Sequence, residues 1–387
     1  MSDQGKISRR SFLKISGSGA AGLGLGLSGR ASESTPRIRE FRELGTTGLR
    51  ISDVGCGCIN LFNAGVLRYA FDGGVNHFDT AEGYLNTNSE RMLGQALQGI
   101  RDKVIITTKL QIRTPADLQR DAFVRRLEDC LRRLRTDYVD IVLVHAIDEP
   151  GRLDHEEVQA GFRKMKEQGK ARHIGFSTHA PALMLTKAIE DGPWEVVLMT
   201  YNHLESAQAE PLIVKARDKG VGLIAMKILA GGMQGRLKPL VNDRTHYAQA
   251  AIRWVMGNPK VDACTITMST YSHVDEYIAA SGQPLRRSDE AVLARYREAA
   301  GPLYCRVSCR ECLAVCPKGV AVNEVLRYAM YYEHYGMERN AMELYGGLEP
   351  ARRPSACDGC SAPCVSACPH GLQVRSRLLE SRAILSA

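Results

Sequence analysis

The sequence has no apolar stretch of the ~20 residues that a transmembrane helix needs. It also lacks a large excess of charge, because the net charge of its 387 residues is only +8 and half of that excess falls within the first thirty residues. A surplus this small on the remaining chain argues against a nucleic-acid partner. Cysteine is scarce before residue 300, where only four of the twelve cysteines lie. The other eight are crowded towards the C-terminus, which favours a metal site.

The length and the pattern of the chain predict two unequal domains, because a (β/α)8 barrel commonly takes ~250 residues. Hydrophobic residues make up 44% of the sequence, which is enough for a sizeable core. Strand-like and helix-like patterns alternate, as in parallel βα units. The expected strands are 53–60, 75–79, 104–109, 139–145, 171–177, 196–201, 222–226 and 263–268. Eight such strands close a barrel.

Titratable side chains follow three successive predicted strands. Asp79 ends the second strand, and Tyr84 comes five residues later. Lys109 and His145 end the third and fourth strands. In a barrel of this type the chemistry lies at the carboxyl ends of the strands. We therefore expect these four side chains to lie close together.

This order of Asp79, Tyr84, Lys109 and His145 resembles the catalytic tetrad of the aldo/keto reductase family, and the resemblance extends over about residues 36–283. It implies that Tyr84 gives a proton to a carbonyl oxygen while His145 orients the substrate. An ordinary phenol has a pKa near ~10, and we expect Lys109 to lower it while Asp79 holds Lys109 in place. The alternative is a buried ion pair beside a core histidine.

The same resemblance implies a nicotinamide nucleotide, NADP or NAD. The implied nucleotide contacts are Ser177, Tyr201, Asn202, Lys227, Leu229, Gly231, Ser269 and His273. Four positions depart from the family pattern: Thr178 replaces an asparagine, Leu198 replaces a glutamine, Met268 replaces the lysine of a lysine-serine pair, and His273 replaces the arginine that binds the 2′-phosphate. A neutral histidine holds a phosphate dianion poorly, so we expect weakened selectivity for NADP. Residues 39–52 resemble the hairpin that plugs the bottom of such barrels.

The N-terminus has the features of an export signal. Arg9 and Arg10 precede Phe12, Leu13 and an uncharged run over residues 15–29. This resembles a twin-arginine signal, which engages the twin-arginine export machinery and carries folded proteins out of the cytoplasm. We assign residues 1–35 to this signal and a linker. No clear Ala-x-Ala cleavage site follows, so cleavage and an uncleaved membrane anchor both remain open, and the alternative is a disordered basic tail.

Two cysteine tracts of similar spacing lie beyond residue 300. They are Cys305, Cys309, Cys312 and Cys316, followed by Pro317, and Cys357, Cys360, Cys364 and Cys368, followed by Pro369. They resemble the [4Fe-4S] ligand runs of bacterial ferredoxins, in which the last cysteine of each run serves the other cluster. The resemblance implies one ligand set of Cys305, Cys309, Cys312 and Cys368, and a second of Cys357, Cys360, Cys364 and Cys316. Each tract has an extra residue in one gap relative to strict ferredoxin spacing, so the number of clusters, one or two, remains open. Zinc binding and disulfide formation are the alternatives.

The remaining segments complete the predicted architecture: a barrel over residues 36–284, then a linking helix and a small, mostly helical ferredoxin-like domain over residues 285–387. We expect Ser288 to cap a helix through residue 300 that returns the chain to the catalytic face. Two tyrosine-rich helices, 322–335 and 340–345, are expected to pack around the cluster domain. The four early cysteines, Cys56, Cys58, Cys130 and Cys264, are expected to be core thiols.

Two functions fit the sequence. The first is an exported aldo/keto reductase that acts on a small aldehyde or ketone, with clusters that pass electrons to a redox partner protein or brace the fold. The second is an exported electron-transfer or interaction protein whose barrel no longer exchanges nucleotide. The complete tetrad favours the first.

Overall fold

The computed structural model describes residues 35–386, except for 113, 191, 206, 233–234 and 242–243. Residues 36–387 form one compact unit. The predicted export signal lies in residues 1–34, outside the described residues.

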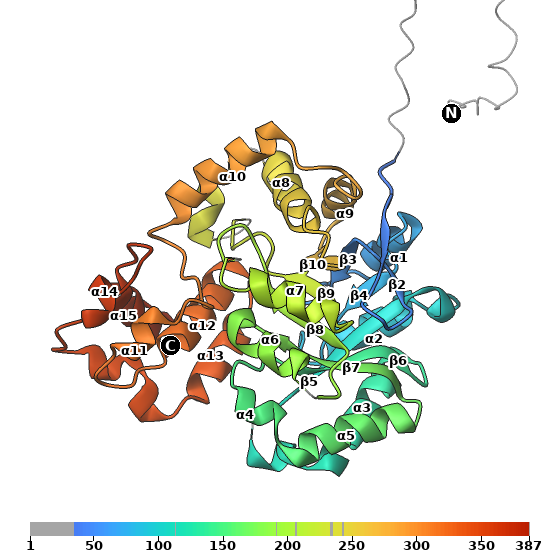
Figure 1. Ribbon diagram of the computed structural model, residues 1–387, viewed down its shortest axis with the longest axis horizontal. Helices are drawn as coiled ribbons and strands as arrows, with labels where there is room; N and C mark the ends of the chain where they lie inside the picture. The colour runs from blue at the N-terminus through green and yellow to red at the C-terminus, as the bar shows by residue number, and fades with distance from the viewer. Residues whose placement is uncertain are drawn as a thin grey trace, which may run out of the picture. The chain divides into compact units, whose positions relative to one another are not determined.

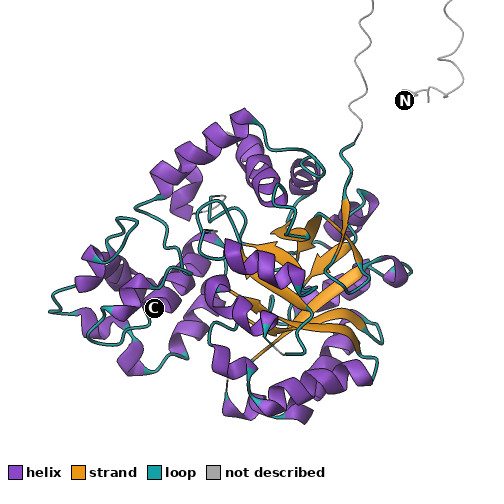
Figure 2. Ribbon diagram, in the orientation of Figure 1, coloured by secondary structure: helices purple, strands orange, loops and turns teal. Residues whose placement is uncertain are grey.

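Eight parallel strands close into a barrel in the order β10-β3-β4-β5-β6-β7-β8-β9, and helices surround it (Figures 1 and 2). The strands are β3 (Val54–Gly57), β4 (His77–Asp79), β5 (Ile105–Gln111), β6 (Val139–His145), β7 (Ala171–Thr178), β8 (Val196–Thr200), β9 (Gly222–Met226) and β10 (Ala263–Thr267). Each lies within or overlaps one of the eight predicted strands, and the predicted fold class is confirmed.

Most helices of the barrel follow a strand, as βα units require. They are α1 (Ala64–Asp72), α2 (Asn88–Ala96), α3 (Arg120–Leu134), α4 (Pro150–Leu153), α5 (Glu156–Glu167), α6 (Pro181–Ile189), α7 (Glu210–Asp218), α8 (Arg244–Met256) and α9 (Tyr271–Ile278). In α3 the apolar residues recur at helical spacing, and Phe123, Leu127 and Leu131 are buried against the barrel.

A hairpin of β1 (Phe41–Glu43) and β2 (Arg50–Ser52) precedes the barrel, as predicted. Its Leu44 and Ile51 are fully buried with side chains from the starts of the barrel strands, such as Val196. The hairpin therefore closes the amino-terminal end. The turn depends on Gly45, which has φ +54° and lies so near residue 220 that a Cβ atom would be 2.4 Å from the Gly220 carbonyl oxygen.

The helix α10 (Arg287–Ala300) joins the barrel to the cysteine-rich segment. Ser288 was expected to cap it, but Ser288 lies inside the first turn. The cap is made by Asp289, whose Oδ2 accepts from the Arg286 backbone N–H at 2.9 Å. The same carboxylate forms a buried, two-pronged ion pair with Arg253 of α8, with both N–O distances 2.8 Å. The Asp289 carboxylate therefore accepts a hydrogen bond from the backbone at the start of α10 and also anchors this helix to the barrel.

The C-terminal segment is mostly helical, and α11–α15 lie together on one side of the barrel in Figure 1, coloured orange to red. These helices are α11 (Glu311–Ala314), α12 (Val322–His334), α13 (Glu338–Gly346), α14 (Pro363–Ser366) and α15 (Val374–Leu385). Short 3₁₀ turns at Pro350–Arg352 and Pro354–Cys357 connect α13 to α14. Their small core combines α12, α13 and α15 with the cysteine tracts.

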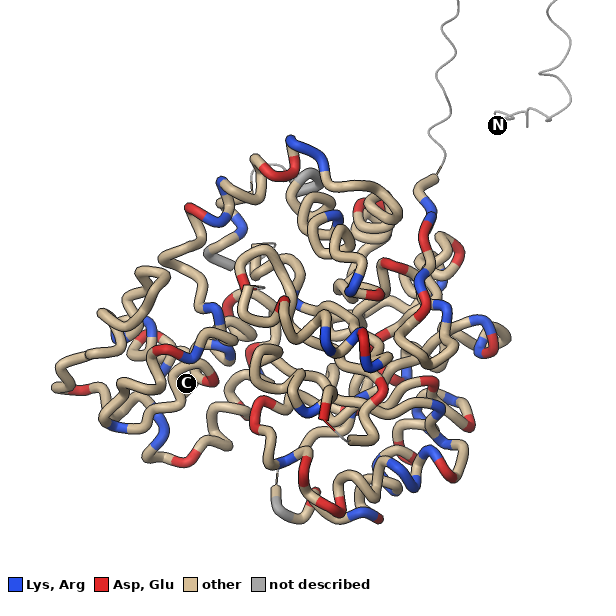
Figure 3. The backbone as a smooth tube through the Cα atoms, viewed as in Figure 1, with Lys and Arg blue, Asp and Glu red and all other residues tan. Residues whose placement is uncertain are grey.

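Positive and negative side chains are intermixed along the elements in Figure 3. Among the described residues, no helix combines the length and the apolar character needed to cross a membrane.

Candidate active site and cysteine sites

The four predicted catalytic residues meet at the carboxyl end of the barrel. The Lys109 ammonium, on β5, lies 2.7 Å from Asp79 Oδ2 at the end of β4 and 2.7 Å from the Thr80 carbonyl oxygen. The same ammonium is 3.4 Å from the Tyr84 hydroxyl. His145 ends β6, and its ring packs edge-on against Tyr84 with 5.7 Å between ring centroids. Three successive strands thus deliver one cluster of titratable groups.

Burial dominates the proton affinities in this cluster. Asp79 and Lys109 are 4% and 1% exposed, respectively. Desolvation raises the pKa of Asp79 and lowers the pKa of Lys109, and their mutual attraction opposes both shifts. The pKa of Tyr84 is raised well above its ordinary value by burial, with Asp79 and Cys58 adding to the effect. The sequence-based expectation that Lys109 would lower the pKa of Tyr84 is wrong, because desolvation of the phenolate outweighs the nearby ammonium.

The loop that carries Tyr84 is held under strain. Leu85, Asn86 and Thr87 follow it with φ values of 50°, 51° and 71°, which side chains other than glycine rarely adopt. The loop is fixed where α2 begins, because the Ser89 hydroxyl donates to the Cys58 carbonyl oxygen at 2.8 Å. Strained backbone of this kind concentrates at functional sites.

A cavity of about 140 Å³ opens beside this cluster and includes Asp79 and Tyr84 in its wall. Five of the eight predicted nucleotide contacts line it: Lys227, Leu229, Gly231, Ser269 and His273. They come from the loops after β9 and β10. The cavity therefore connects the catalytic cluster with the segments expected to hold a nucleotide.

The other three predicted contacts do not line this cavity. Ser177 accepts a hydrogen bond from the Ala146 backbone at 2.8 Å. Asn202 donates to the Lys227 carbonyl at 3.2 Å, so it supports the cavity wall from behind. Tyr201 was expected to stack on the nicotinamide, but it turns outwards from the barrel. Its hydroxyl donates to Glu210 at 2.6 Å and its ring packs on Trp254.

Several residues of the cavity wall were not predicted from the sequence. Cys58, Asn60 and Thr265 line it from the barrel. Among the described residues, Asn60 Oδ1 and Thr265 Oγ1 are buried without a hydrogen-bond partner. Polar atoms of this kind favour a polar ligand. His334 and Tyr335 also line the cavity, although they belong to α12 and its end. No local pattern could have placed these two beside residues so distant in the chain.

The helix α12 is docked on the catalytic face by a buried polar cluster. Arg327 donates to Asp148 Oδ2 and, at 3.1 Å, contacts His179 Nδ1. The other ring nitrogen, Nε2, lies 2.9 Å from the Tyr331 hydroxyl. Burial and Arg327 hold the pKa of His179 well below its usual range, so the imidazole is neutral. Asn60 adds a further contact by donating to the Tyr335 carbonyl. The tyrosines of α12 were expected to pack around the cluster domain, and Tyr328 and Tyr331 do lie in its core. Tyr331 also contacts the barrel.

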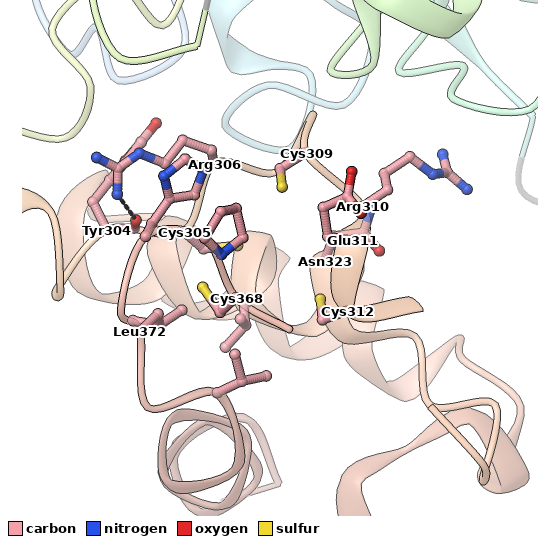
Figure 4. A pocket seen from close by; sticks show the side chains of 14 residues that line it. Tyr304, Cys305, Arg306, Cys309, Arg310, Glu311, Cys312, Asn323, Cys368 and Leu372 are labelled. Atoms are coloured by element: carbon pink, nitrogen blue, oxygen red, sulfur yellow. Dashed lines mark hydrogen bonds between the residues drawn. The ribbon is translucent and has the colours of Figure 1, made fainter. Parts of the chain in front are cut away.

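The eight late cysteines gather into two groups of four. One small cavity is lined by Cys305, Cys309, Cys312 and Cys368, whose side chains surround it in Figure 4. A second is lined by Cys316, Cys357, Cys360 and Cys364. These groups are the crossed sets that the ferredoxin resemblance implied. None of the twelve cysteines, all of which lie within the described residues, forms a disulfide.

The donor chemistry of each group fits an iron-sulfur cluster, because four thiolates are the usual ligands of a [4Fe-4S] cube. Among the described residues, no three Cys, His, Asp or Glu side chains converge as the ligands of a single metal ion do. The sulfurs around a cube bind four different iron atoms, so they surround a volume instead of a point. Two separate four-cysteine cavities match that requirement.

Comparison with known proteins agrees with this architecture. A model of the aldo/keto reductase family matches residues 62–239. A model of the 4Fe-4S dicluster domain matches residues 304–372, and a model of the TAT (twin-arginine translocation) pathway signal sequence matches residues 6–26. The chain is therefore a barrel oxidoreductase with a ferredoxin-type 4Fe-4S domain and an N-terminal signal that indicates export.

Comparison with individual proteins identifies the family to which the barrel belongs. L-galactose dehydrogenase from Arabidopsis thaliana is 30% identical over 281 residues, which cover 62% of this chain and 88% of that protein. A structure described as an aldo-keto reductase from Pseudomonas aeruginosa has a TM-score of 0.55 at 26% identity and covers 65% of this chain and 98% of its own. The aldo/keto reductase of Klebsiella pneumoniae, solved with NADP and acetate, has a TM-score of 0.55 at 24% identity, covering 66% and 94%. The chain belongs to the aldo/keto reductase family.

Proposed function

We propose that the protein transfers a hydride between a nicotinamide nucleotide and the carbonyl carbon of an aldehyde or ketone. The observation that carries this proposal is the contact of the Lys109 ammonium with both Asp79 and Tyr84, at 2.7 and 3.4 Å, beside a cavity that Asp79 and Tyr84 line. We assign the barrel domain to residues 36–284 and the linking helix with the ferredoxin-like domain to residues 285–387.

In this mechanism the bound nucleotide supplies the hydride, and the chain supplies a proton and orientation. The Tyr84 hydroxyl donates its proton to the carbonyl oxygen. His145 lies beside Tyr84 and orients that oxygen. Lys109, fixed by Asp79 and by the Thr80 carbonyl, places positive charge next to the phenolate that forms. The segments after β9 and β10 that contain Leu229, Gly231, Ser269 and His273 hold the nucleotide.

The first test is the substitution Tyr84→Phe in the cluster-loaded protein. Removing the proton donor should lower kcat for aldehyde reduction by about 100-fold to 10,000-fold while the unfolding temperature stays the same. The matched control is Tyr138→Phe, because Tyr138 packs between Arg101 and Arg172 next to the start of β6, at the other end of that strand from His145. Unchanged turnover in Tyr84→Phe would refute the assignment.

The same proposal includes two [4Fe-4S] clusters, one in each four-cysteine cavity. Anaerobically purified protein should then be brown, with absorbance near about 400 nm, and should contain two four-iron clusters per chain. A single cluster, or zinc in place of iron, would overturn this part alone. The closeness of the sulfurs in each crossed set supports the pairing.

We further propose that the folded, loaded protein works outside the cytoplasm, in the periplasm, after twin-arginine export. The export machinery would recognise the pair Arg9 and Arg10. Replacing both by lysine should leave the protein in the cytoplasm, and N-terminal sequencing of the exported protein distinguishes a cleaved signal from an anchor.

A second function is favoured by one observation, namely that His334 and Tyr335 of the C-terminal domain lie in the wall of the nucleotide cavity. If these residues seal the cavity, the protein is an electron-transfer or interaction protein that exchanges no nucleotide. Calorimetry with NADPH and NADH on the loaded protein separates the two functions. An exchangeable site supports the reductase, and the absence of binding supports the alternative.

A further inference from the structure

Lys227 has an unusual backbone conformation at the mouth of the barrel. It follows β9 directly and has φ +59°, in the left-handed region. Its carbonyl oxygen is fixed from two sides, by the Ala230 N–H at 3.0 Å and by Asn202 Nδ2 at 3.2 Å. A lysine held at a strained backbone position is pointed in one direction by the surrounding structure. That direction is into the cavity described above.

The ammonium of Lys227 is enclosed by aromatic rings of the C-terminal domain. It lies 4.7 Å from the ring centroid of Tyr331 and 4.0 Å from that of Tyr335, both contributed by α12 and its end. These cation–π contacts hold the charge but do not neutralise it. The site is thus assembled from both domains.

Within the described part of the chain, the partly exposed Lys227 takes part in no ion pair, in contrast to three buried cations of the barrel and of α12. Lys109 is paired with Asp79, Arg253 with Asp289 and Arg327 with Asp148. A desolvated charge without a counter-ion is costly, and a bound anion offsets that cost. Burial accordingly lowers the pKa of Lys227 to about 7, with Arg327 and Lys109 adding to the effect and Asp79 opposing it.

The anion that would sit on Lys227 lies close to the reacting groups. Lys227, Asp79 and Tyr84 line the same cavity, and the charges of Lys109 and Asp79 act on Lys227. Two of the predicted nucleotide contacts, Ser269 and His273, follow β10, whereas Leu229 and Gly231 follow β9 together with Lys227. An oxyanion held by Lys227 therefore belongs more naturally to the molecule reduced beside Tyr84 than to the far end of the nucleotide.

We propose that Lys227 binds the carboxylate of the substrate, so that the substrates are small carbonyl compounds that also carry a carboxylate, such as oxo acids and aldehyde acids. This inference rests on the proposed reductase function and deepens it. The other available oxyanion is the pyrophosphate of the nucleotide, and the experiment is built to separate the two.

The experiment compares each of two aldehyde acids with its methyl ester: succinic semialdehyde and 4-carboxybenzaldehyde. Each pair has the same carbonyl and differs in charge. In the loaded wild-type protein, kcat/KM should favour the acid by about tenfold or more, as expected for a charge-assisted contact. In Lys227→Met this acid-to-ester ratio should fall to about one. Lys227→Arg should restore part of it, and Lys215→Met, at an exposed lysine of α7, should leave it unchanged.

A binding measurement keeps the inference testable if turnover is absent. Benzoate should bind the loaded wild-type protein at least about tenfold more tightly than benzamide by calorimetry, and Lys227→Met should remove that difference. Lys227→Gln serves as a second variant if the methionine variant does not fold.

The outcomes separate the failure of each proposal. Benzoate binding that depends on Lys227 without any aldehyde reduction keeps the anion site and overturns the reductase function. Reduction of acid and ester with equal kcat/KM overturns the anion site and keeps the reductase. A tenfold weaker Kd for the nucleotide in Lys227→Met, with an unchanged acid-to-ester ratio, assigns Lys227 to the pyrophosphate and also overturns the inference.

Discussion

The Tyr84 hydroxyl lies 3.4 Å from the Lys109 ammonium, yet its pKa is raised because burial and the charge of Asp79 both favour the neutral phenol. A phenol that keeps its proton at neutral pH has a proton to give to a carbonyl oxygen, although the raised pKa makes it a weaker acid, and it cannot act as a base towards an alcohol until that proton has left. At the scale of single residues, the site is therefore better prepared for reduction than for oxidation near neutral pH. After Tyr84 has given up its proton, the positive charge of Lys109 stabilises the phenolate.

The low proton affinity of Lys227 leads to a prediction about pH. The groups that face its ammonium are Tyr331, Tyr335, Asp79, Lys109 and Arg327, and the resulting pKa is about 7. A bound carboxylate favours the charged ammonium and raises that pKa. Binding of benzoate should therefore take up about one proton at pH 8 and almost none at pH 6. Calorimetry in two buffers of different ionisation enthalpy measures this uptake, and equal heats at pH 8 would contradict the prediction.

His273 gives a second prediction at this scale. Its backbone N–H is held by Thr270 at 3.1 Å in the first turn of α9, and its ring stacks on Tyr277 at 5.4 Å. The imidazole lines the nucleotide cavity but carries no fixed charge for a 2′-phosphate. We expect the Kd values for NADPH and NADH to differ by less than about 100-fold, and His273→Arg to shift the ratio about tenfold towards NADPH. A larger preference of the wild-type protein for NADPH would show that a group other than His273 binds the 2′-phosphate.

At the scale of elements, α12 is the contact between the two halves of the molecule. Arg327 from this helix reaches Asp148 and His179 on the barrel, and both Arg327 and His179 are buried. Because Arg327→Met leaves the carboxylate of Asp148 without its cation, the free energy of unfolding should fall by about 3 kcal/mol. Urea unfolding measures this loss. Arg339→Met, which removes a solvent-exposed pair with Glu343, should change stability by less than about 0.5 kcal/mol.

The elements also show how far the sequence alone reaches. Alternating patterns predicted all eight strands, and the tetrad positions followed because strand ends are visible in sequence. The side of the sheet that a residue faces at the very end of a strand was not visible, so Tyr201 was placed in the cavity although it packs on Trp254. Capping was also misjudged, because Ser288 and Asp289 are adjacent and only tertiary contact with Arg253 distinguishes them.

The helix α12 illustrates the limit most clearly. Its tyrosines at 328, 331 and 335 recur at helical spacing, so a shared face was predictable. The surface against which that face packs depends on contacts between residues that are far apart in the sequence, such as Arg327 with His179. Local patterns hold no information on such pairs. The contribution of His334 and Tyr335 to the cavity could therefore be found only in the structure.

At the scale of the whole molecule, one small core joins the cysteine tracts to the catalytic face. It packs the buried residues of α12, such as Val325 and Ala329, with Cys357 and Cys364 of the second tract. The opposite face of α12 touches the barrel through Arg327 and forms part of the cavity through His334. The cysteine sites and the nucleotide cavity therefore both adjoin α12. We expect the position of this helix to depend on the cysteine sites.

This arrangement predicts that removing iron opens the cavity. When a metal site is emptied, the segments that its ligands hold together lose that constraint. After iron is removed anaerobically by a chelator, amide hydrogen exchange over residues 322–335 should accelerate about tenfold or more, while β4–β6 keep their protection. Benzoate should then bind the iron-free protein more weakly, because Tyr331 and Tyr335 no longer hold the Lys227 ammonium. A matched sample reconstituted with iron and sulfide serves as the control and should regain protection. If α12 stays protected without iron, the clusters do not brace the catalytic face, and electron transfer becomes the stronger explanation for their presence.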